Sequence, residues 1–263
     1  MRLSREVRFF AGNNDDGAAV SNTWSGTAVG GCAGPFRRMV VEVEGTIDPQ
    51  TGFLCNIAEL DTLLLKRVIP HCTQDELRGS ATVACIGSAL IGSFQAAQTF
   101  IPEGVRLAKL RLFLSPFLQI HVLEGETAVI HLTQSFEFSA AHRLYCASLT
   151  EAENRRVFGK CAHPNGHGHN YVLDVTIAGT PDTATGTLIE LPGFDKIVRA
   201  SVVDYFDHKH LNLDCEEFHD LNPSVENIAR VIWNRLVDPL HPATLETVRV
   251  WETPKTCAVY QGR

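Results

Sequence analysis

The sequence lacks the features that mark membrane and secreted proteins. No apolar run approaches the ~20 residues that a membrane-spanning helix needs. The first residues, MRLSREVRFFAGNNDD, contain no apolar core of a signal peptide. A basic surplus is also missing, because 23 lysines and arginines stand against 30 aspartates and glutamates, for a formal net charge of −7. We therefore expect no membrane partner, and no nucleic-acid partner bound through a basic surface.

The sequence also has no CxxC pair, which argues against a cysteine-based zinc knuckle. Its eight cysteines are scattered along the chain and form no compact disulfide framework. With 263 residues, 44% of them hydrophobic, the chain has enough apolar side chains for one large or two small domains without disulfide staples. These features predict reduced thiols and a cytoplasmic protein.

One pattern occurs twice along the chain. The stretch that begins at Val40 resembles the stretch that begins at Val172, and four identities recur at one constant offset. Each stretch predicts an alternating strand, a polar D-x-x-T-G turn, a short apolar strand and then a helix. The alternative is that any two β-hairpins look alike, but a single shared offset argues against it. The four identities are Gly45 with Gly179, Asp48 with Asp182, Thr51 with Thr185, and Gly52 with Gly186.

The two halves of the sequence also end alike. RLFLSPFLQIHVLEG and RVWETPKTCAVYQG each predict two strands that are broken at a proline, Pro116 or Pro254. A helix is expected before each pair of strands. It is clear in NPSVENIARVIWNRLV, where Pro223 and Ser224 stand at the start, and less clear in ATVACIGSALIGSF. We therefore predict two ββααββ units in tandem, divided near residues 125–132.

The stretch FGKCAHPNGHGHNY, residues 158–171, concentrates histidines and points to a metal. If a strand starts there, alternation places His167 and His169 on the same face. The stretch SFEFSAAHRL offers His142 at the end of an alternating run, on an expected neighbouring strand. Three imidazoles leave one position open on the metal, as in a catalytic zinc site, although iron or copper stays open. The alternative is a strand with two hydrogen-bonded surface histidines.

The second half of the chain resembles the 6-pyruvoyl-tetrahydropterin synthases. FSAAHRL, FGKC…PNGHGHNY, DHKHLNLD, NPSVENIA and VWETPKTCAVY occur in this order over about residues 132–263. The related 6-carboxytetrahydropterin synthases share most of these motifs. The resemblance implies Zn²⁺ bound by His142, His167 and His169. His163 stands where the family usually has a neutral polar residue, so we expect that it does not bind the metal.

The same resemblance implies a fold and a division of the chain. The fold class would be α+β, with tandem tunnelling-fold (T-fold) units that assemble into a barrel. Each unit would be an antiparallel four-stranded sheet with two helices on one face. We expect residues 131–263 to form the catalytic unit and residues 1–130 to form a degenerate repeat that lacks the metal and pterin ligands. A homo-oligomer with active sites near unit interfaces is expected as well.

Further residues match functional positions of the family. Cys161 matches a base, and we expect a nearby metal or base to lower its pKa so that the thiolate forms at neutral pH. Asp207 and His208 match an acid–histidine relay, in which the carboxylate fixes the imidazole. Glu252 matches the glutamate that anchors the pterin, and Ser224 stands where a threonine is often found and is expected to bind substrate. Without the resemblance, a packed cysteine and a surface DHK turn are the simpler interpretations.

The resemblance implies a zinc-dependent lyase. The expected reaction converts 7,8-dihydroneopterin triphosphate to 6-pyruvoyl-tetrahydropterin with loss of triphosphate. The spacing between Cys161 and His167, which includes Pro164 and Asn165, favours this type over the 6-carboxytetrahydropterin synthases of deazapurine and queuosine biosynthesis. That second type stays open, as does a non-catalytic scaffold that binds zinc or pterin.

Overall fold

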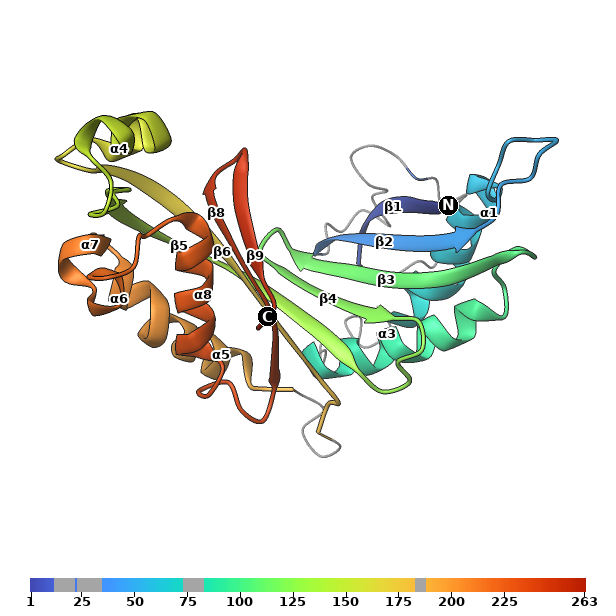
Figure 1. The fold of residues 1–263 in the computed structure, drawn as a ribbon. Helices are drawn as coiled ribbons and strands as arrows, with labels where there is room; N and C mark the ends of the chain where they lie inside the picture. Colours follow the sequence, from blue (N-terminus) through green and yellow to red (C-terminus); the bar gives the residue numbers. More distant parts are fainter. Residues whose placement is uncertain (12–21, 23–34, 73–82, 183–187) are drawn as a thin grey trace. The chain divides into compact units, whose positions relative to one another are not determined.

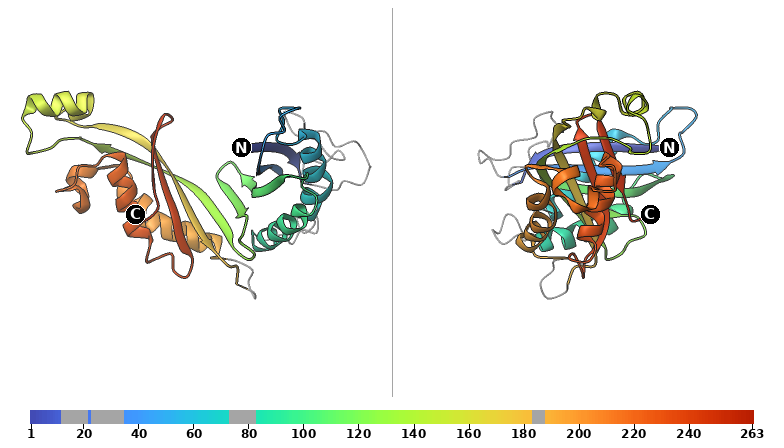
Figure 2. Two further views of the ribbon diagram at one scale, coloured as in Figure 1. Left: turned by 45° about the vertical axis from the view of Figure 1, so that its right-hand side comes forward. Right: turned by 60° about the vertical axis from the view of Figure 1, so that its left-hand side comes forward.

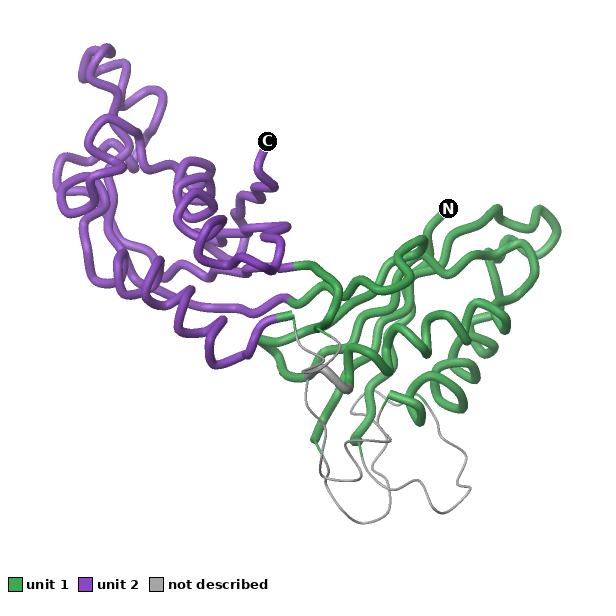
Figure 3. The backbone as a smooth tube through the Cα atoms, turned by 90° about the horizontal axis from the view of Figure 1, so that it is seen from below, with its two compact units in different colours: residues 1–132, 178–188 green, residues 133–177, 189–263 purple. Residues whose placement is uncertain are grey.

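The computed structural model describes residues 1–11, 22, 35–72, 83–182 and 188–263. The described residues form two compact units, shown in Figure 3. Unit 1 contains residues 1–132 and 178–188, and unit 2 contains residues 133–177 and 189–263. No helix among the described residues is both long and apolar enough to cross a membrane.

Unit 1 is a four-stranded antiparallel sheet with two helical segments (Figure 1). The strands lie in the order β1-β2-β3-β4. Helix α3 packs against β3 and β4, and α1 packs against β1. The strands are β1 (Arg2–Phe10), β2 (Phe36–Gly45), β3 (Val105–Ser115) and β4 (Leu118–Leu123), and the helices are α1 (Ile57–Leu63), continued by a π-helical turn over Leu64–Val68, and α3 (Val83–Gln98).

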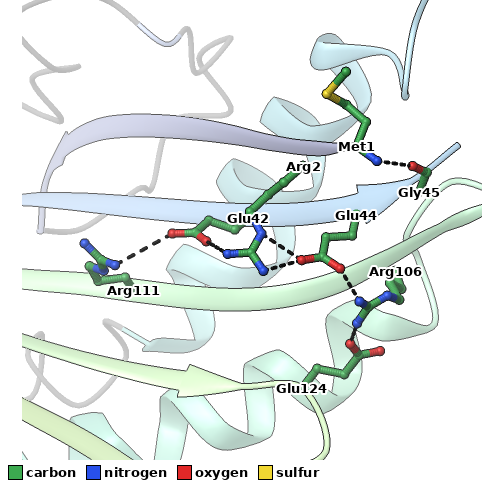
Figure 4. Close-up of polar contacts among 8 residues, drawn as sticks. All are labelled: Met1, Arg2, Glu42, Glu44, Gly45, Arg106, Arg111 and Glu124. Carbon is green, nitrogen blue, oxygen red and sulfur yellow. Dashed lines mark hydrogen bonds and ion pairs between the residues drawn. The ribbon is translucent and has the colours of Figure 1, made fainter. Parts of the chain in front are cut away.

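Alternation along the strands separates the two faces of this sheet. In β2, Met39, Val41 and Val43 are fully buried, because odd positions share one face of a strand. The opposite face carries charged side chains, and Figure 4 shows their ion pairs. Arg2 pairs with Glu42 and Glu44, Arg106 pairs with Glu44 and Glu124, and Arg111 pairs with Glu42.

Unit 2 has the same order of elements with several insertions. Its sheet has the strand order β5-β6-β8-β9, and the short strand β7 pairs in parallel with the end of β5. Helix α8 packs against β8 and β9, and α5 and α8 lie on the same side of the sheet (Figures 1 and 2). The strands are β5 (Ile130–His142), β6 (His167–Gly179), β7 (Lys209–His210), β8 (Thr244–Thr253) and β9 (Thr256–Tyr260).

The helices of unit 2 bury apolar residues at helical spacing against the sheet. Phe194, Val198 and Val202 are fully buried, and so is Ile232 of α8. The rings of Phe136 in β5 and Phe194 lie edge to face, 6.1 Å apart. The helices are α4 (Glu151–Phe158), α5 (Leu191–Val198), continued by a π-helical turn over Arg199–Val203, α6 (Asp204–Phe206), α7 (Leu211–Asp214) and α8 (Val225–Leu236), with 3₁₀ turns at Gly159–Ala162 and Glu216–Phe218.

The structure confirms the α+β class and most of the predicted elements. Each unit has a four-stranded sheet with helices, and the paired strands break at Pro116 and Pro254. Helix α3 covers most of the stretch ATVACIGSALIGSF, where the sequence predicts a helix in the first half. That both units descend from one duplicated unit stays a prediction, as do the catalytic and degenerate assignments of the halves and the assembly into a barrel. Of the four repeated identities, Thr185 and Gly186 lie outside the described residues.

One local prediction is wrong. No strand follows the D-x-x-T-G turn after β2, and the hairpin partner of β2 is the upstream strand β1. The Asp48 carboxylate accepts the backbone N–H groups of Gln50 and Thr51, and Gly52 has a left-handed φ of 72°. Asn56 then caps α1 through the N–H of Ala58. This leaves too few residues between turn and cap for a strand.

Candidate active site

Three histidines converge at one end of the unit 2 sheet. His142 is the last residue of β5, and His167 and His169 share a face at the start of the neighbouring strand β6. One ring nitrogen from each lies within 4.8 Å of the others. The Nε2 atoms of His142 and His167 are 3.1 Å apart. The structure therefore brings together the three residues that the sequence selected as metal ligands.

The surroundings of these imidazoles keep His142 and His167 neutral. His142 is fully buried, and its Nδ1 donates a hydrogen bond of 2.7 Å to the carbonyl of Pro223. Burial lowers the pKa of His142 to about 4, and it also lowers the pKa of His167. Because Nδ1 of His142 carries the proton, its Nε2 presents a lone pair to the other two rings.

The donor set fits a metal ion. Nδ1 of His167 and Nε2 of His169 are buried without a hydrogen-bond partner, and buried polar atoms are rarely left unsatisfied. Three neutral imidazoles suit zinc, and they also suit copper or iron. His163 is exposed and accepts the N–H of Asn165, outside this group.

Cys161 lies in the 3₁₀ turn between α4 and β6 and is partly exposed. Its carbonyl accepts the N–H of Leu144, two residues beyond His142. Burial and the charge of Glu252 raise the pKa of the Cys161 thiol. The sequence predicts the opposite direction in the presence of a metal or base. Without such a cation, the thiol is protonated at neutral pH.

Asp207 and His208 form the hydrogen-bonded pair that the motif predicts. His208 Nδ1 and Asp207 Oδ2 are 2.7 Å apart. Ser139 of β5 holds both residues, because its N–H donates to Asp207 Oδ1 at 2.7 Å and its carbonyl accepts the N–H of His208 at 2.6 Å. The Ser139 N–H is the main cause that lowers the pKa of Asp207.

The imidazole of His208 points away from the Ser139 backbone that holds the pair. Its side chain is 85% exposed, and its φ of 58° lies in the left-handed region. The ring lines a pocket together with His169, Asn170 and His210. Of the candidate metal ligands, His169 lines the same pocket as His208. Among the described residues, no hydrogen bond or ion pair joins the Asp207–His208 pair to Cys161, His142 or His167. The exposed ring is therefore available to substrate or to another chain.

Glu252 reaches the histidines from β8. Its Oε1 lies 3.4 Å from Nε2 of His142 and 3.7 Å from Nε2 of His169. Ser224 stands at the start of α8, as the sequence predicts, and its hydroxyl accepts the N–H of Asn227 and caps the helix. The expected assignments of Glu252 and Ser224 to substrate binding stay predictions.

Sequence reasoning also missed Tyr171. It lies two positions beyond His169 on the same face of β6, is fully buried, and makes an edge contact with the His169 ring at 5.6 Å. Continuing the alternation of His167 and His169 by one step would have found it. The Tyr171 ring also makes an edge contact with the His142 ring, so it packs against two of the three histidines.

The fold and this site define an α+β unit whose sheet brings together three histidines that could hold a metal ion. The sequence model of the 6-pyruvoyl tetrahydropterin synthase family matches residues 131–263, and the chain belongs to this family. The human 6-pyruvoyl tetrahydrobiopterin synthase is 39% identical over 138 residues, which cover 52% of this chain and 95% of that protein.

Two further relatives complete the comparison. The 6-carboxy-5,6,7,8-tetrahydropterin synthase of Haemophilus influenzae is 27% identical over 150 residues, covering 49% of this chain and 97% of that protein. A solved structure of 6-pyruvoyl tetrahydropterin synthase from Caenorhabditis elegans is 36% identical, with a TM-score of 0.48, and covers 51% of this chain and 96% of that chain. Each of these matches spans about half of the present chain.

Proposed function

We propose that the chain is a zinc-dependent lyase that converts 7,8-dihydroneopterin triphosphate to 6-pyruvoyl-tetrahydropterin with loss of triphosphate. The observation that carries the proposal is the convergence of His142, His167 and His169 within 4.8 Å in a chain of this family. The human 6-pyruvoyl tetrahydrobiopterin synthase supports the reaction type, because this chain is 39% identical to it and covers 95% of its length.

The reaction requires that triphosphate is eliminated and that hydrogens move from the side chain to the ring, so protons bound to carbon must be removed. When bound by the three imidazoles, zinc would supply positive charge that acidifies these C–H bonds and lowers the pKa of a nearby thiol. The protein contributes the imidazoles of His142 and His167, whose Nε2 atoms are 3.1 Å apart and whose protonated forms are disfavoured by burial.

We assign two groups of the chain to proton transfer. Cys161 would be the base that takes a proton from carbon, since a thiolate is a base of nearly neutral pKa and the side chain is partly exposed. We assign the Asp207–His208 pair as the second proton carrier. The Asp207 carboxylate accepts Nδ1–H of His208 at 2.7 Å, so Nε2 is left to exchange a proton with the substrate.

Glu252 is assigned to substrate recognition. A carboxylate accepts two parallel N–H groups, and the pterin offers its 2-amino and N3 hydrogens in this arrangement. The Glu252 side chain is 18% exposed and points to the metal centre, so a pterin bound there would have its side chain close to the histidines. Ser224 would add a hydroxyl contact beyond its capping role.

A homo-oligomer is part of the proposal. Members of this family are expected to complete their active sites between neighbouring units, and the exposed ring of His208 is consistent with a substrate or partner chain on that side. The partner is then a second copy of this chain, and the small-molecule partner is the pterin triphosphate.

The second candidate function is the synthesis of 6-carboxytetrahydropterin. It is supported by the Haemophilus influenzae relative, but the identity is 27%, compared with 39% for the human relative. A scaffold without activity is the third, and the presence of Cys161, Asp207, His208 and Glu252 argues against it.

Product analysis tests the proposal. Purified chain is incubated with 7,8-dihydroneopterin triphosphate and Zn²⁺, and the products are identified by mass spectrometry. We expect release of triphosphate together with the pyruvoyl product. A product with a one-carbon carboxyl side chain assigns the second type, and bound metal without turnover supports the scaffold.

A further inference from the structure

The metal ligand His142 is oriented by a backbone carbonyl from a distant segment. Pro223 precedes α8, and its carbonyl oxygen lies 2.7 Å from Nδ1 of His142. The ring is fully buried, so water does not replace this acceptor. The Tyr171 hydroxyl lies 3.5 Å from the same Nδ1, so the shorter bond to the Pro223 carbonyl is the main contact that favours the proton on Nδ1 and leaves Nε2 facing the other imidazoles.

The turn that presents this carbonyl is tied together by asparagine. The carbonyl of Asn222 accepts the N–H of Ser224 at 2.8 Å and the side-chain amide of Asn227 at 2.8 Å. These bonds fold residues 222–224 into a tight turn at the start of α8. The Pro223 carbonyl is left outside this set of bonds and points to His142.

The same asparagine also ties the turn to the chain that leaves His142. Asn222 Oδ1 accepts the backbone N–H of Tyr145 at 3.2 Å, three residues beyond the metal ligand. Only an oxygen accepts this N–H, so the orientation of the Asn222 amide is set by the bond. One side chain thus links the segment that carries the ligand to the turn that carries its hydrogen-bond acceptor.

We propose that Asn222 is a positioning residue for the metal centre: it locks the Pro223 carbonyl against His142 so that Nδ1 is protonated and Nε2 is presented to the metal. The inference rests on the proposed metal centre, and it adds a residue that does not touch the metal or substrate. Outer partners of metal-bound histidines typically change metal affinity about 10–100-fold when they are removed.

The test compares three variants with the unaltered chain. Asn222→Ala removes the acceptor for Tyr145, whereas Asn222→Asp keeps an oxygen in the same place. Asn56→Ala is the matched control, because it removes a side-chain acceptor of one backbone N–H at the start of α1 in unit 1. Zn²⁺ affinity is measured by competition with a chromophoric chelator.

We expect Asn222→Ala to weaken Zn²⁺ binding about 10–100-fold, whereas Asn222→Asp and Asn56→Ala bind like the unaltered chain. Equal loss in Asn222→Ala and Asn56→Ala would show general loosening, and equal loss in Asn222→Asp would show that the Tyr145 bond is not responsible. Either outcome overturns the inference, as does unchanged affinity in Asn222→Ala.

A second readout uses the metal-free protein, so that failure of the Asn222 inference can be told apart from failure of the proposed metal centre. ¹⁵N NMR of labelled histidine reports the tautomer of His142, with the signal assigned by a His142→Gln variant. We expect the Nδ1–H tautomer in the unaltered chain and a mixture in Asn222→Ala. If that variant does not fold, Asn227→Ala loosens the same turn and is measured in its place. The same tautomer in all folded variants contradicts the inference even if no metal binds.

Discussion

Burial lowers the pKa of two of the three candidate metal ligands, His142 and His167. His142 has no exposed surface, and burial outweighs its bond to the Pro223 carbonyl, which acts in the opposite direction on its pKa. His167 follows the same rule with more exposure. A buried neutral imidazole keeps its lone pair at neutral pH, and this is the form that binds metals. The chain thereby prepares ligands before any metal arrives.

The ligand assignment is tested by two neighbouring histidines. We expect His167→Ala to lose the bound metal, because it removes one of three converging nitrogens. His163→Ala should keep the metal, since that side chain is exposed and accepts the N–H of Asn165, away from the three converging nitrogens. Metal content of both purified variants by atomic emission checks this. Loss in both, or in neither, contradicts the assignment.

Cys161 offers a prediction about turnover. We expect Cys161→Ala to keep its metal and substrate affinity but to lose at least ~10²-fold in kcat, the usual effect of removing a general base. Steady-state kinetics and metal content are measured on the same preparation. Near-normal turnover would return Cys161 to the class of packed cysteines.

His121 in β4 of unit 1 gives a prediction on pH. It is 7% exposed, and burial, with the charge of Lys109 next, lowers its pKa from 6.5 to about 2. In the unfolded chain the imidazole takes up a proton near pH 6.5, whereas the folded chain does so only near pH 2. Its contribution to stability is therefore complete above pH 6.5 and is lost as pH falls toward 2, with a slope of about 1.4 kcal/mol per pH unit.

Urea unfolding of the metal-free chain between pH 7 and pH 4 measures this slope. We expect His121→Leu to flatten the acid side of the curve, because leucine binds no proton in either state. An unchanged slope would show that His121 does not carry this pH dependence.

At the scale of the element, α8 joins the core to the site. Its buried residues, including Ile228 and Ile232, pack on the sheet. Its N-cap is Ser224, and the residue just before that cap, Pro223, supplies the carbonyl that accepts from His142. Because α8 is fixed on the sheet, the chain at its start, which contacts the metal ligand His142, is held in place as well. For this reason a change at its start affects both stability and the site.

Ser224 separates these two effects. We expect Ser224→Ala to lower the free energy of unfolding by about 1 kcal/mol, because a helix loses its N-cap. Ser224→Asp should restore stability, since aspartate is an equally good cap. If the hydroxyl also binds substrate, Ser224→Asp will still have a raised KM. Chemical denaturation and kinetics of both variants distinguish a cap alone from a cap that contacts substrate.

At the scale of the whole molecule, the two units share an order of strands and helices but differ in the polar side chains that they carry. Unit 2 carries the three histidines, while the outer face of the unit 1 sheet carries ion pairs such as Arg2 with Glu44. Each ion pair on an exposed face stabilises little by itself. The positions that match Glu252 in the predicted repeat hold Leu114, which has no acceptor side chain. We therefore predict that unit 1 contributes strands and helices to the molecule and no second pterin site.

Expression of residues 131–263 alone tests what unit 1 contributes. An isolated four-stranded sheet has two unpaired edge strands, which invite aggregation. We expect the fragment to aggregate or to assemble without the turnover of the full chain. Sedimentation and kinetics of fragment and full chain are compared. A soluble fragment that assembles and turns over substrate like the full chain contradicts this role.

The sequence by itself indicated β2, β6, the strand pairs that end each half, the helices before those pairs and the three histidines, because alternation and helical spacing are local. It did not indicate β1 or α4. It also led to the family through five ordered motifs. It failed at the segment after β2, where the side chains of Asp48 and Asn56 close a turn and cap a helix within a few residues.

Only the tertiary structure decided how these groups are held. Pro223 and His142 are far apart along the chain, and no periodicity relates them, yet their hydrogen bond orients a ligand. Likewise, the charge of Glu252 acts on Cys161 only because the end of β8 lies beside the start of β6 in the folded sheet. Protonation states and hydrogen-bond partners depend on burial and on contacts between distant segments, and these exist only after the chain has folded.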